Sequence, residues 1–197
     1  MAETNPRPKL MSALRDAQHL RRFSNRDANE RWSGPIATSS GLKVFVRPAR
    51  SGDRAALERF FASLSEDDLY FRFLSGIRKI DDDRLEAMLC DTDDHSIDFL
   101  ALDIETGEIL AAAMLVADNA FETAEFALST RPIAKGKGIS WALLDLAARY
   151  AGVMGVKRLQ SLQSASQSDA LQLEREMGFT VRACPDDSTL MLAELEF

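Results

Sequence analysis

The chain has 197 residues, 46% of them hydrophobic, and a formal net charge of −7. This length suits one well-filled core, so we predict a single globular domain with an appendage. No stretch of the sequence approaches the roughly 18 consecutive apolar residues of a membrane span, and residues 1–10 lack the apolar segment of a signal peptide. We therefore expect a cytoplasmic protein with no membrane partner.

The negative charge is unevenly distributed along the chain. Residues 1–40 hold seven Lys or Arg and four Asp or Glu, which leaves 17 basic and 27 acidic residues in 41–197. A nucleic-acid-binding surface needs clustered positive charge, so the acidic body disfavours a nucleic-acid partner. A local basic site for a phosphorylated ligand is still compatible with this balance.

The two cysteines, Cys90 and Cys184, lie far apart, and neither belongs to a CxxC motif or to a spacing typical of zinc ligands. We expect both to be reduced, buried thiols, and we expect no metal site. His19 and His95 lie outside any motif, so we assign them no function.

Residues 1–40 mix Pro, Asn, Ser and Gly with charged residues, which predicts an N-terminal arm. Four apolar residues of the arm recur at helical spacing: Leu10, Leu14, Ala17 and Leu20. Residues 8–22 therefore form one amphipathic helix, or the whole arm is mobile. The folded domain is predicted to span residues 41–197.

The domain begins with a strand and three helices. In LKVFVRPAR (42–50), Val44 and Val46 alternate with their neighbours as in a strand, and Pro48 ends the alternation. Ser51 then provides an N-cap for the first helix. The three helices are predicted over 51–64, 66–73 and 81–89.

Three strands follow these helices. The segment IDFLALDIETGEILAAAMLVAD (97–118) contains two apolar runs separated by Glu105, Thr106 and Gly107. This pattern predicts a hairpin, because glycine allows a positive φ at the turn. A third apolar run, TAEFALST (123–130), follows closely, so we expect three antiparallel strands.

The remaining elements alternate between helices and strands. They are a helix over 138–152, a strand over 156–163, a helix over 168–177 and two final strands over 179–184 and 188–197. The complete order predicts a mixed α/β sheet with helices on its faces.

The segment KGKGIS (135–140) precedes the long helix. Backbone N–H groups at a helix start have no intrahelical partner and carry the positive end of the helix dipole, so they bind anions readily. Glycine lets a phosphate approach these groups closely, and the two lysines add positive charge. The spacing excludes a Walker P-loop and a Rossmann fingerprint. From these six residues alone, a phosphate site and a pair of glycines that only tightens helix packing are equally compatible.

This segment resembles the acetyl-CoA pyrophosphate loop of the GNAT superfamily of N-acyltransferases. The family pattern is Gln or Arg, two residues, Gly, one residue, then Gly or Ala, and Lys135, Gly138 and Ser140 occupy the three positions. The family also has a long strand before the loop and a later helix that closes on Gly-Phe, which corresponds to DALQLEREMGF (169–179) here. The likeness extends from about residue 42 to residue 180.

Within the superfamily, the chain is most similar to the acetyltransferase domains of bacterial protein lysine acetyltransferases that modify acyl-CoA synthetases. RPARSGDRAALERFFASLSEDDLYFRF, GEILAAAMLVAD and TAEFALSTRPIAKGKG occur in the same order and at similar separations in that group. The resemblance implies a GNAT-like mixed α/β fold, with a mostly antiparallel sheet of about six to seven strands flanked by helices. It also implies an N-acetyltransferase with acetyl-CoA as co-substrate and an amine acceptor, which is a protein lysine or a small molecule.

The resemblance implies Glu125 as the catalytic base. An amine must be neutral to attack a thioester, so a protonated lysine, with a pKa near ~10.4, needs a base within reach. Glu125 lies in the strand that runs beside the thioester in GNAT proteins, where similar protein acetyltransferases carry a glutamate. The alternative is that Glu125 lies on the more solvent-exposed face of the sheet, because the apolar residues Phe126 and Leu128 alternate with it along the strand. Glu122 is a second candidate for the base.

The resemblance also implies a set of acetyl-CoA-binding residues. In the family, the strand of Glu125 bulges and splays from the next parallel strand, which leaves backbone groups for the pantetheine arm. Gln167 replaces the usual Asn at the start of the later helix. The implied residues are Leu128, Ser129, Thr130, Lys135, Gly136, Lys137, Gly138, Ile139, Ser140 and Gln167.

No general acid for the departing thiolate is implied. Many GNAT enzymes place a tyrosine four residues before the Gly of Gly-Phe, and the matching residue here is Glu174. Tyr150 is expected to pack on the long helix, and Tyr70 to line the acceptor cleft. A thiol as acidic as coenzyme A can leave without an acid, so this gap is compatible with catalysis.

Three functions stay open on the sequence. They are acetyl transfer to a protein lysine, the same chemistry on a small amine, and acyl-CoA binding by a non-catalytic sensor. Glu125 and the intact glycines favour the two enzymes, whereas the substituted loop, the missing tyrosine and Gln167 favour the sensor. The oligomeric state is also open, and a homodimer is compatible with the sequence.

Overall fold

The computed structural model describes residues 23, 28, 31–74, 79–89 and 94–197. The helix predicted over 8–22 and the position of Cys90 lie outside these residues. Cys184 is a free thiol that is half-buried rather than fully buried, because it lies just beyond a strand at the edge of the sheet. Within the described ranges, no helix has the combination of length and hydrophobicity that a bilayer span requires.

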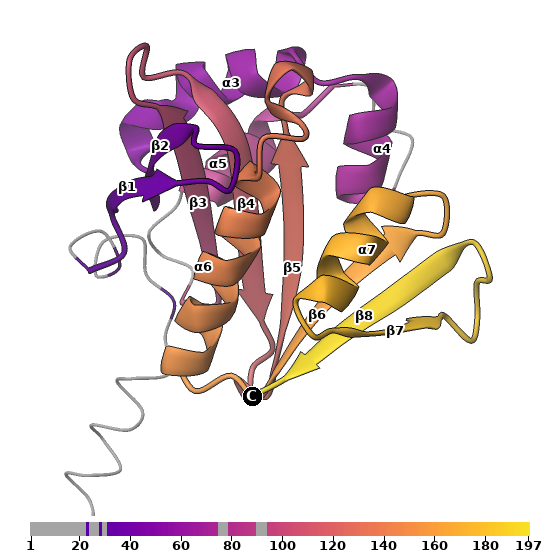
Figure 1. Ribbon diagram of the computed structural model, residues 1–197. Coiled ribbons are helices and arrows are strands. Elements are labelled where there is room, and N and C mark those ends of the chain that lie inside the picture. Colours follow the sequence, from indigo (N-terminus) through magenta and orange to yellow (C-terminus); the bar gives the residue numbers. More distant parts are fainter. Residues whose placement is uncertain (1–22, 24–27, 29–30, 75–78, 90–93) are drawn as a thin grey trace, which may run out of the picture.

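One sheet of eight strands organises the described residues, in the order β1-β2-β3-β4-β5-β6-β8-β7. Only β5 and β6 pair in parallel, so the predicted mixed and mostly antiparallel sheet is confirmed (Figure 1). The strands are β1 (Gly34–Ala37), β2 (Lys43–Pro48), β3 (Ser96–Asp103), β4 (Ile109–Ala117), β5 (Thr123–Thr130), β6 (Arg158–Ser164), β7 (Thr180–Ala183) and β8 (Leu190–Glu196).

The first strand, β1, was not predicted from the sequence. It lies within the residues assigned to the arm and pairs with β2, from Gly34 opposite Val46 to Ala37 opposite Lys43. The sheet therefore begins before residue 41 and has eight strands instead of six to seven. Its four residues, GPIA, show no alternation of apolar and polar side chains, and a proline is tolerated there because β1 is an edge strand.

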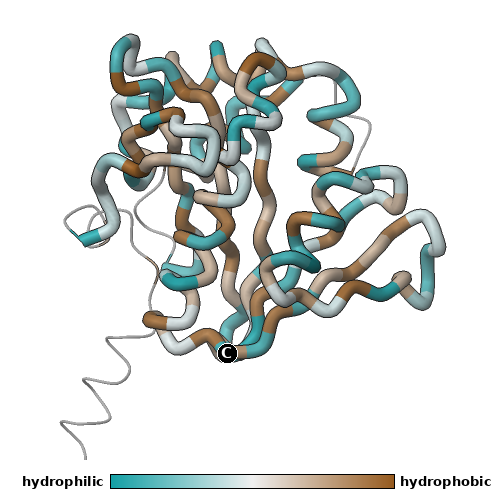
Figure 2. The backbone as a smooth tube through the Cα atoms, viewed as in Figure 1, coloured by the Kyte–Doolittle hydropathy of each residue, from teal (hydrophilic) through white to brown (hydrophobic). Residues whose placement is uncertain are grey.

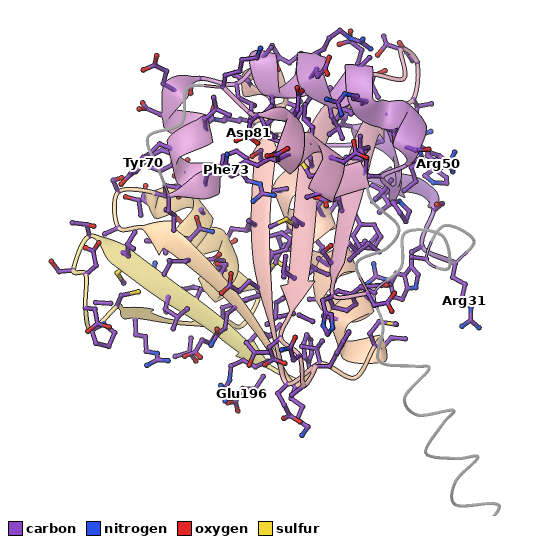
Figure 3. All side chains as sticks on the ribbon, turned by 180° about the vertical axis from the view of Figure 1, so that it is seen from behind. Arg31, Arg50, Tyr70, Phe73, Asp81 and Glu196 are labelled. Atoms are coloured by element: carbon purple, nitrogen blue, oxygen red, sulfur yellow. The ribbon has the colours of Figure 1, made fainter. Side chains whose placement is uncertain are left out.

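Helices cover both faces of the sheet. They are α3 (Arg54–Ala62), α4 (Glu66–Phe73), α5 (Asp82–Leu89), α6 (Ile139–Val153) and α7 (Ser168–Glu176), with short 3-10 turns η1 (Ser51–Asp53) and η2 (Pro132–Ala134). One face carries α6 and α7 and points toward the viewer in Figure 1. The other face carries α3, α4 and α5 and points toward the viewer in Figure 3.

The core lies on both sides of the sheet. Adjacent residues of β3 show this, because Phe99 packs in the cluster under α6 whereas Leu100 packs in the cluster under α3 and α5. Successive side chains of a strand point to opposite faces, so a strand covered on both sides is apolar throughout. Figure 2 shows these hydrophobic residues along the central strands and along α6.

Aromatic packing fixes α6 against the sheet. Tyr150 of α6 is 2% exposed, and its ring centroid lies 5.3 Å from those of Phe23 and Phe99 and 5.2 Å from that of Trp32. The prediction that Tyr150 has a packing role at the long helix is confirmed. Phe23, which lies within the residues assigned to the arm, is fully buried in the same cluster.

Candidate active site

The parallel strands β5 and β6 pair with each other at one end only, and we call this paired end the join. They pair from Thr123 to Glu125 of β5, over three residue pairs, although β5 continues to Thr130 and β6 to Ser164. Beyond this join the strands diverge (Figure 1), so their facing N–H and C=O groups have no ladder partner. The predicted splay is present, but the predicted bulge in β5 is not, because β5 keeps a continuous register with β4 through Thr130.

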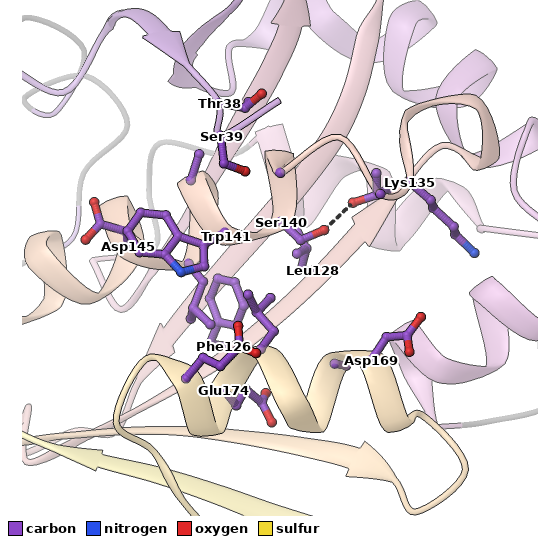
Figure 4. A pocket seen from close by; sticks show the side chains of 18 of the residues that line it. Thr38, Ser39, Phe126, Leu128, Lys135, Ser140, Trp141, Asp145, Asp169 and Glu174 are labelled. Carbon is purple, nitrogen blue, oxygen red and sulfur yellow. Dashed lines mark hydrogen bonds between the residues drawn. The ribbon is translucent and has the colours of Figure 1, made fainter. Parts of the chain in front are cut away.

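An open groove of about 1170 Å³ occupies the space between the diverging strands and the start of α6. Its walls are α6, α7, the open half of β5, the turn between β1 and β2, and part of α4 (Figure 4). Phe126, Leu128 and Leu173 give the groove an apolar wall, and Gln163 and Gln167 add amide groups. This lining suits an elongated ligand with both apolar and amide parts.

The N-terminus of α6 opens onto this groove without a cap. Its N-cap residue is Gly138, with φ 76°, so no side chain accepts a hydrogen bond from the first turn, which also lacks an acidic residue. The N–H groups of a first helical turn have no intrahelical acceptor and carry the positive end of the helix dipole. The start of α6 is therefore suited to an anion, which favours the phosphate interpretation of KGKGIS.

The turn between β1 and β2 packs against Gly138. A Cβ atom at Gly138 would lie 2.5 Å from Ser39 Oγ and 3.2 Å from Thr38 Cβ. The Ser40 hydroxyl donates a hydrogen bond to the Lys137 carbonyl at 2.9 Å. The positive φ favours glycine at position 138, and the packing of the turn against this glycine places Ser39 at the rim of the groove (Figure 4).

The groove brings together seven of the predicted cofactor-binding residues: Leu128, Thr130, Lys135, Gly136, Gly138, Ser140 and Gln167. The hydroxyls of Ser140 and Thr130 lie 3.2 Å apart, so the first turn of α6 is tied to the end of β5. Oε1 of Gln167 is buried and has no partner among the described residues. A hydrogen-bond donor of a ligand would satisfy it.

Three predicted cofactor-binding side chains do not line the groove: Ser129, Lys137 and Ile139. Ser129 is buried on the side of β5 opposite Leu128, as strand alternation requires. Ile139 is buried in the core under α6, and Lys137 is exposed. At Ser129 and Ile139, only backbone groups can face a ligand in the groove.

Lys135 is held by a carboxylate of α4. Its Nζ bonds to Oδ1 of Asp68. Burial raises the pKa of Asp68, but the hydrogen bonds from Lys135 and Ser65 outweigh this effect and hold the pKa below its usual value. The positive charge of Lys135 is therefore partly neutralised in the absence of a ligand.

Glu125 lies at the join, on the side of β5 opposite the groove. It forms the last β5–β6 pair, with Gln160, and its side chain is exposed. Phe126 and Leu128 point into the groove instead. Glu122, the second candidate for the base, lies just before the join and forms an ion pair with Lys157 at 2.7 Å.

Glu174 of α7 is a buried carboxyl group in the wall of the groove. The residue is 2% exposed, and its Oε1 accepts hydrogen bonds from Ser161 Oγ and, at 3.0 Å, from Gln163 Nε2. Its Oε2 has no partner in the described part of the chain. Burial raises the pKa of Glu174, and the hydrogen bonds from Ser161 and Gln163 oppose that rise only in part.

The groove wall includes residues that sequence reasoning missed, among them Ser39, Asp68 and Trp141. Trp141 had a local signal, because a tryptophan directly after a glycine loop, here 47% exposed, is an unusual surface residue. Ser39 and Asp68 had none, since they reach the loop only through the pairing of β1 with β2 and the packing of α4.

Comparison with known proteins identifies the family. A model described as the acetyltransferase (GNAT) family matches residues 58–179. This chain belongs to the GNAT acetyltransferase family. Acetyltransferase PA5475 of Pseudomonas aeruginosa is 27% identical over 157 residues, which cover 79% of this chain and 84% of that protein.

Solved GNAT structures share the fold of this protein. The GNAT domain of S. lividans PAT superposes with a TM-score of 0.77 at 18% identity, over 85% of this chain and 98% of that chain. The spermidine N-acetyltransferase SpeG chimera from Vibrio cholerae and hSSAT gives a TM-score of 0.61 at 16% identity, over 78% of this chain and 95% of that chain.

GNAT proteins transfer an acetyl group from acetyl-CoA or a related acyl-CoA to an amine, and the groove fits such a molecule. The uncapped start of α6 suits the pyrophosphate, and the unpaired edge of β5 suits the amides of the pantetheine arm.

Proposed function

We propose that this protein is an acetyl-CoA-dependent N-acetyltransferase that modifies a lysine side chain of a protein, with Glu125 as the general base. The observation that carries the proposal is the position of Glu125 in the last residue pair before β5 and β6 diverge. A pantetheine arm that follows the open edge of β5 from the start of α6 ends at this join. The thioester then lies beside Glu125.

Different residues along the groove would bind different parts of acetyl-CoA. The N–H groups at the start of α6 would bind the pyrophosphate, and the backbone of Leu128, Ser129 and Thr130 would bind the pantetheine amides. Glu125 would take the proton that the amine must lose before or during attack on the thioester. The groove lies on one side of β5 and Glu125 on the other, so donor and acceptor would meet through the gap between the strands.

The exposure of the acceptor side favours a protein over a small amine. Glu125 is exposed, and Tyr70 on α4 (Figure 3) is 43% exposed. Small-molecule sites bury most of their ligand in a concave pocket. A lysine on a protein surface needs no such pocket, because the surrounding surface of its own protein excludes water from the site.

The variant Glu125→Gln tests the base. It keeps the shape and the hydrogen-bonding capacity of the side chain but cannot take a proton, so we expect turnover to fall by roughly 10²–10⁴ while coenzyme A affinity, measured by titration calorimetry, stays unchanged. Glu122→Gln is the matched control, and it should retain wild-type turnover. Near-normal turnover of Glu125→Gln would contradict the assignment.

The acceptor is tested with isotopically labelled acetyl-CoA. The protein is incubated in parallel with a proteome extract and with a panel of small amines that includes polyamines, and the products are identified by mass spectrometry. We expect labelled lysines in a few proteins, and we expect these labels to be absent with Glu125→Gln. Labelled small amines alone would establish the small-molecule alternative. Acetyl-CoA binding without any labelled product would establish the sensor.

A further inference from the structure

The two tryptophans of the chain have opposite surroundings. Trp32 packs against the core, where its ring centroid lies 5.2 Å from that of Tyr150. Trp141 belongs to neither core cluster of the described residues, is 47% exposed and lines the groove. A single exposed apolar side chain needs no explanation on an open surface, but an aromatic ring in the wall of a groove is a contact for a ligand.

We propose that Trp141 binds the adenine ring of coenzyme A by stacking, and that the nucleotide end of the ligand lies along α6. This inference rests on the proposed function, because it assigns a further binding residue to the same site. It gives the chain a contact for the one part of coenzyme A that neither the start of α6 nor the edge of β5 binds.

Trp141 is placed next to the proposed pyrophosphate site. It is the third residue of α6, directly after Ser140, so its side chain leaves from the same uncapped first turn. The pyrophosphate of coenzyme A links pantetheine on one side to adenosine on the other. If pantetheine follows the edge of β5, adenosine leaves the start of α6 in another direction, where the side chain of Trp141 is within reach.

The groove wall continues along α6 beyond its first turn. Trp141, Asp145 and Arg149 all line the groove and follow one another at intervals of four residues, which places them on one side of the helix (Figure 4). At the rise of an α-helix, this stretch is roughly 12 Å long. A ribose and its base fit along such a wall.

The charges of this wall suit a neutral base better than a phosphate. Arg149 forms an ion pair with Asp145 at 2.9 Å, so the two charges largely cancel. The phosphates are therefore favoured at the start of α6, where the helix dipole is positive, and not beside Asp145. The amino group of adenine is a hydrogen-bond donor, which makes a neighbouring carboxylate compatible with this base.

Stacking also explains how the site binds a ligand although its lysine is partly neutralised. Lys135 is paired with Asp68, which weakens its attraction for a phosphate. A base that stacks on an aromatic side chain contributes affinity through contact area, which salt screens much less than an ion pair. Trp141 therefore supplements the electrostatic part of the site.

The variants Trp141→Ala and Trp141→Phe test the stacking contact by titration calorimetry. We expect Trp141→Ala to weaken coenzyme A binding by roughly 5- to 100-fold, the usual range for the loss of one stacked base. Trp141→Phe should keep most of the affinity, because a phenyl ring also stacks. As a matched ligand, 4′-phosphopantetheine lacks the nucleotide, so it should bind equally to the wild type and to Trp141→Ala.

Tryptophan fluorescence gives a second readout that needs neither turnover nor Trp141→Ala. A stacked adenine quenches indole emission, so coenzyme A should quench the wild type, whereas 4′-phosphopantetheine should not. Trp141→Phe leaves Trp32 as the single emitter, and coenzyme A should cause no quenching in this variant. Quenching that persists in Trp141→Phe would overturn the proposal.

Two further outcomes would contradict the adenine contact. An equal loss of affinity for coenzyme A and for 4′-phosphopantetheine in Trp141→Ala would assign Trp141 to the pantetheine arm. Unchanged coenzyme A affinity in Trp141→Ala would show that the indole does not touch this ligand. Thermal unfolding without ligand is the control for both, and we expect wild-type stability because the side chain belongs to neither core cluster.

Failure of this inference is distinguishable from failure of the proposed function. An active enzyme whose coenzyme A affinity does not depend on Trp141 would remove the adenine contact and leave the N-acetyltransferase intact. A protein with quenching that depends on Trp141 but no turnover would keep the contact and remove the enzyme. A protein that binds no coenzyme A would refute both.

Discussion

The N-termini of α4 and α6 face the same groove but are built in opposite ways. In α4, the N-cap Ser65 accepts a hydrogen bond from the Asp68 N–H at 3.1 Å, and three acidic residues occupy the first turn: Glu66, Asp67 and Asp68. In α6, the N-cap is Gly138, and neither a side-chain cap nor an acidic residue is present. The cap satisfies the N–H group of Asp68 within α4, whereas no side chain caps the first turn of α6. The start of α6 is therefore better suited to an anionic ligand than the start of α4.

An acidic residue in the first turn of α6 would make it similar to α4 and has the largest expected effect. Ser140→Asp places a carboxylate where the phosphates would bind, so we expect coenzyme A affinity to fall at least tenfold, or about 1.4 kcal/mol. The same charge interacts favourably with the helix dipole, so the free energy of unfolding without ligand should hold or rise by up to about 1 kcal/mol. Titration calorimetry and thermal unfolding measure the two effects.

Ser140→Asn is the matched control for this variant, because it has the same size without the charge. It should lose much less affinity than Ser140→Asp. Equal losses in the two variants would show that steric crowding near Thr130 matters and that no anion binds at the start of α6.

Removal of the α4 N-cap should lower stability and leave coenzyme A affinity unchanged, which is opposite to the effects expected of Ser140→Asp. Ser65→Ala deletes the acceptor for the Asp68 N–H, and we expect the free energy of unfolding to fall by about 1 kcal/mol. Coenzyme A affinity should stay at the wild-type value, because the N–H groups of α4 are not part of the proposed site. Chemical denaturation and calorimetry check this pair of outcomes. A loss of affinity that exceeds the loss of stability would make α4 a binding element as well.

The ion pair between the two elements should have the smallest effect. Asp68→Asn releases Lys135 and removes a negative charge from the groove, so we expect coenzyme A affinity to rise by roughly two- to fivefold at low salt. The gain should disappear at high salt and in a Lys135→Ala background, since it depends on the charge of that lysine. A gain that persists in Lys135→Ala would assign the effect to the carboxylate alone.

Most of the fold could be predicted because its signals are local. The hairpin of β3 and β4, the strand β5 and the helices from α3 to α7 all have apolar periodicity or turn residues within their own segments. β1 could not be predicted, because GPIA has no pattern of its own and is held only by pairing with β2.

The site was predictable only where it is contiguous in sequence. Leu128, Thr130 and most of KGKGIS line the groove as expected. Lys137 does not, because the direction of a side chain in a loop depends on the packing of that loop. Glu174 was located by its spacing from Gly-Phe, but its burial and its bond to Ser161 depend on how α7 packs against β6, which the sequence does not show.

The short join between β5 and β6 also bears on the mechanics of the protein. Three residue pairs connect the two strands, whereas the antiparallel ladders of β4 with β5 and of β6 with β8 run along nearly the whole strands. The sheet therefore has two antiparallel parts, β1–β5 and β6–β8, which are connected through the three residue pairs of β5 and β6. The groove lies where β5 and β6 diverge, so its width depends on the angle between these two parts of the sheet.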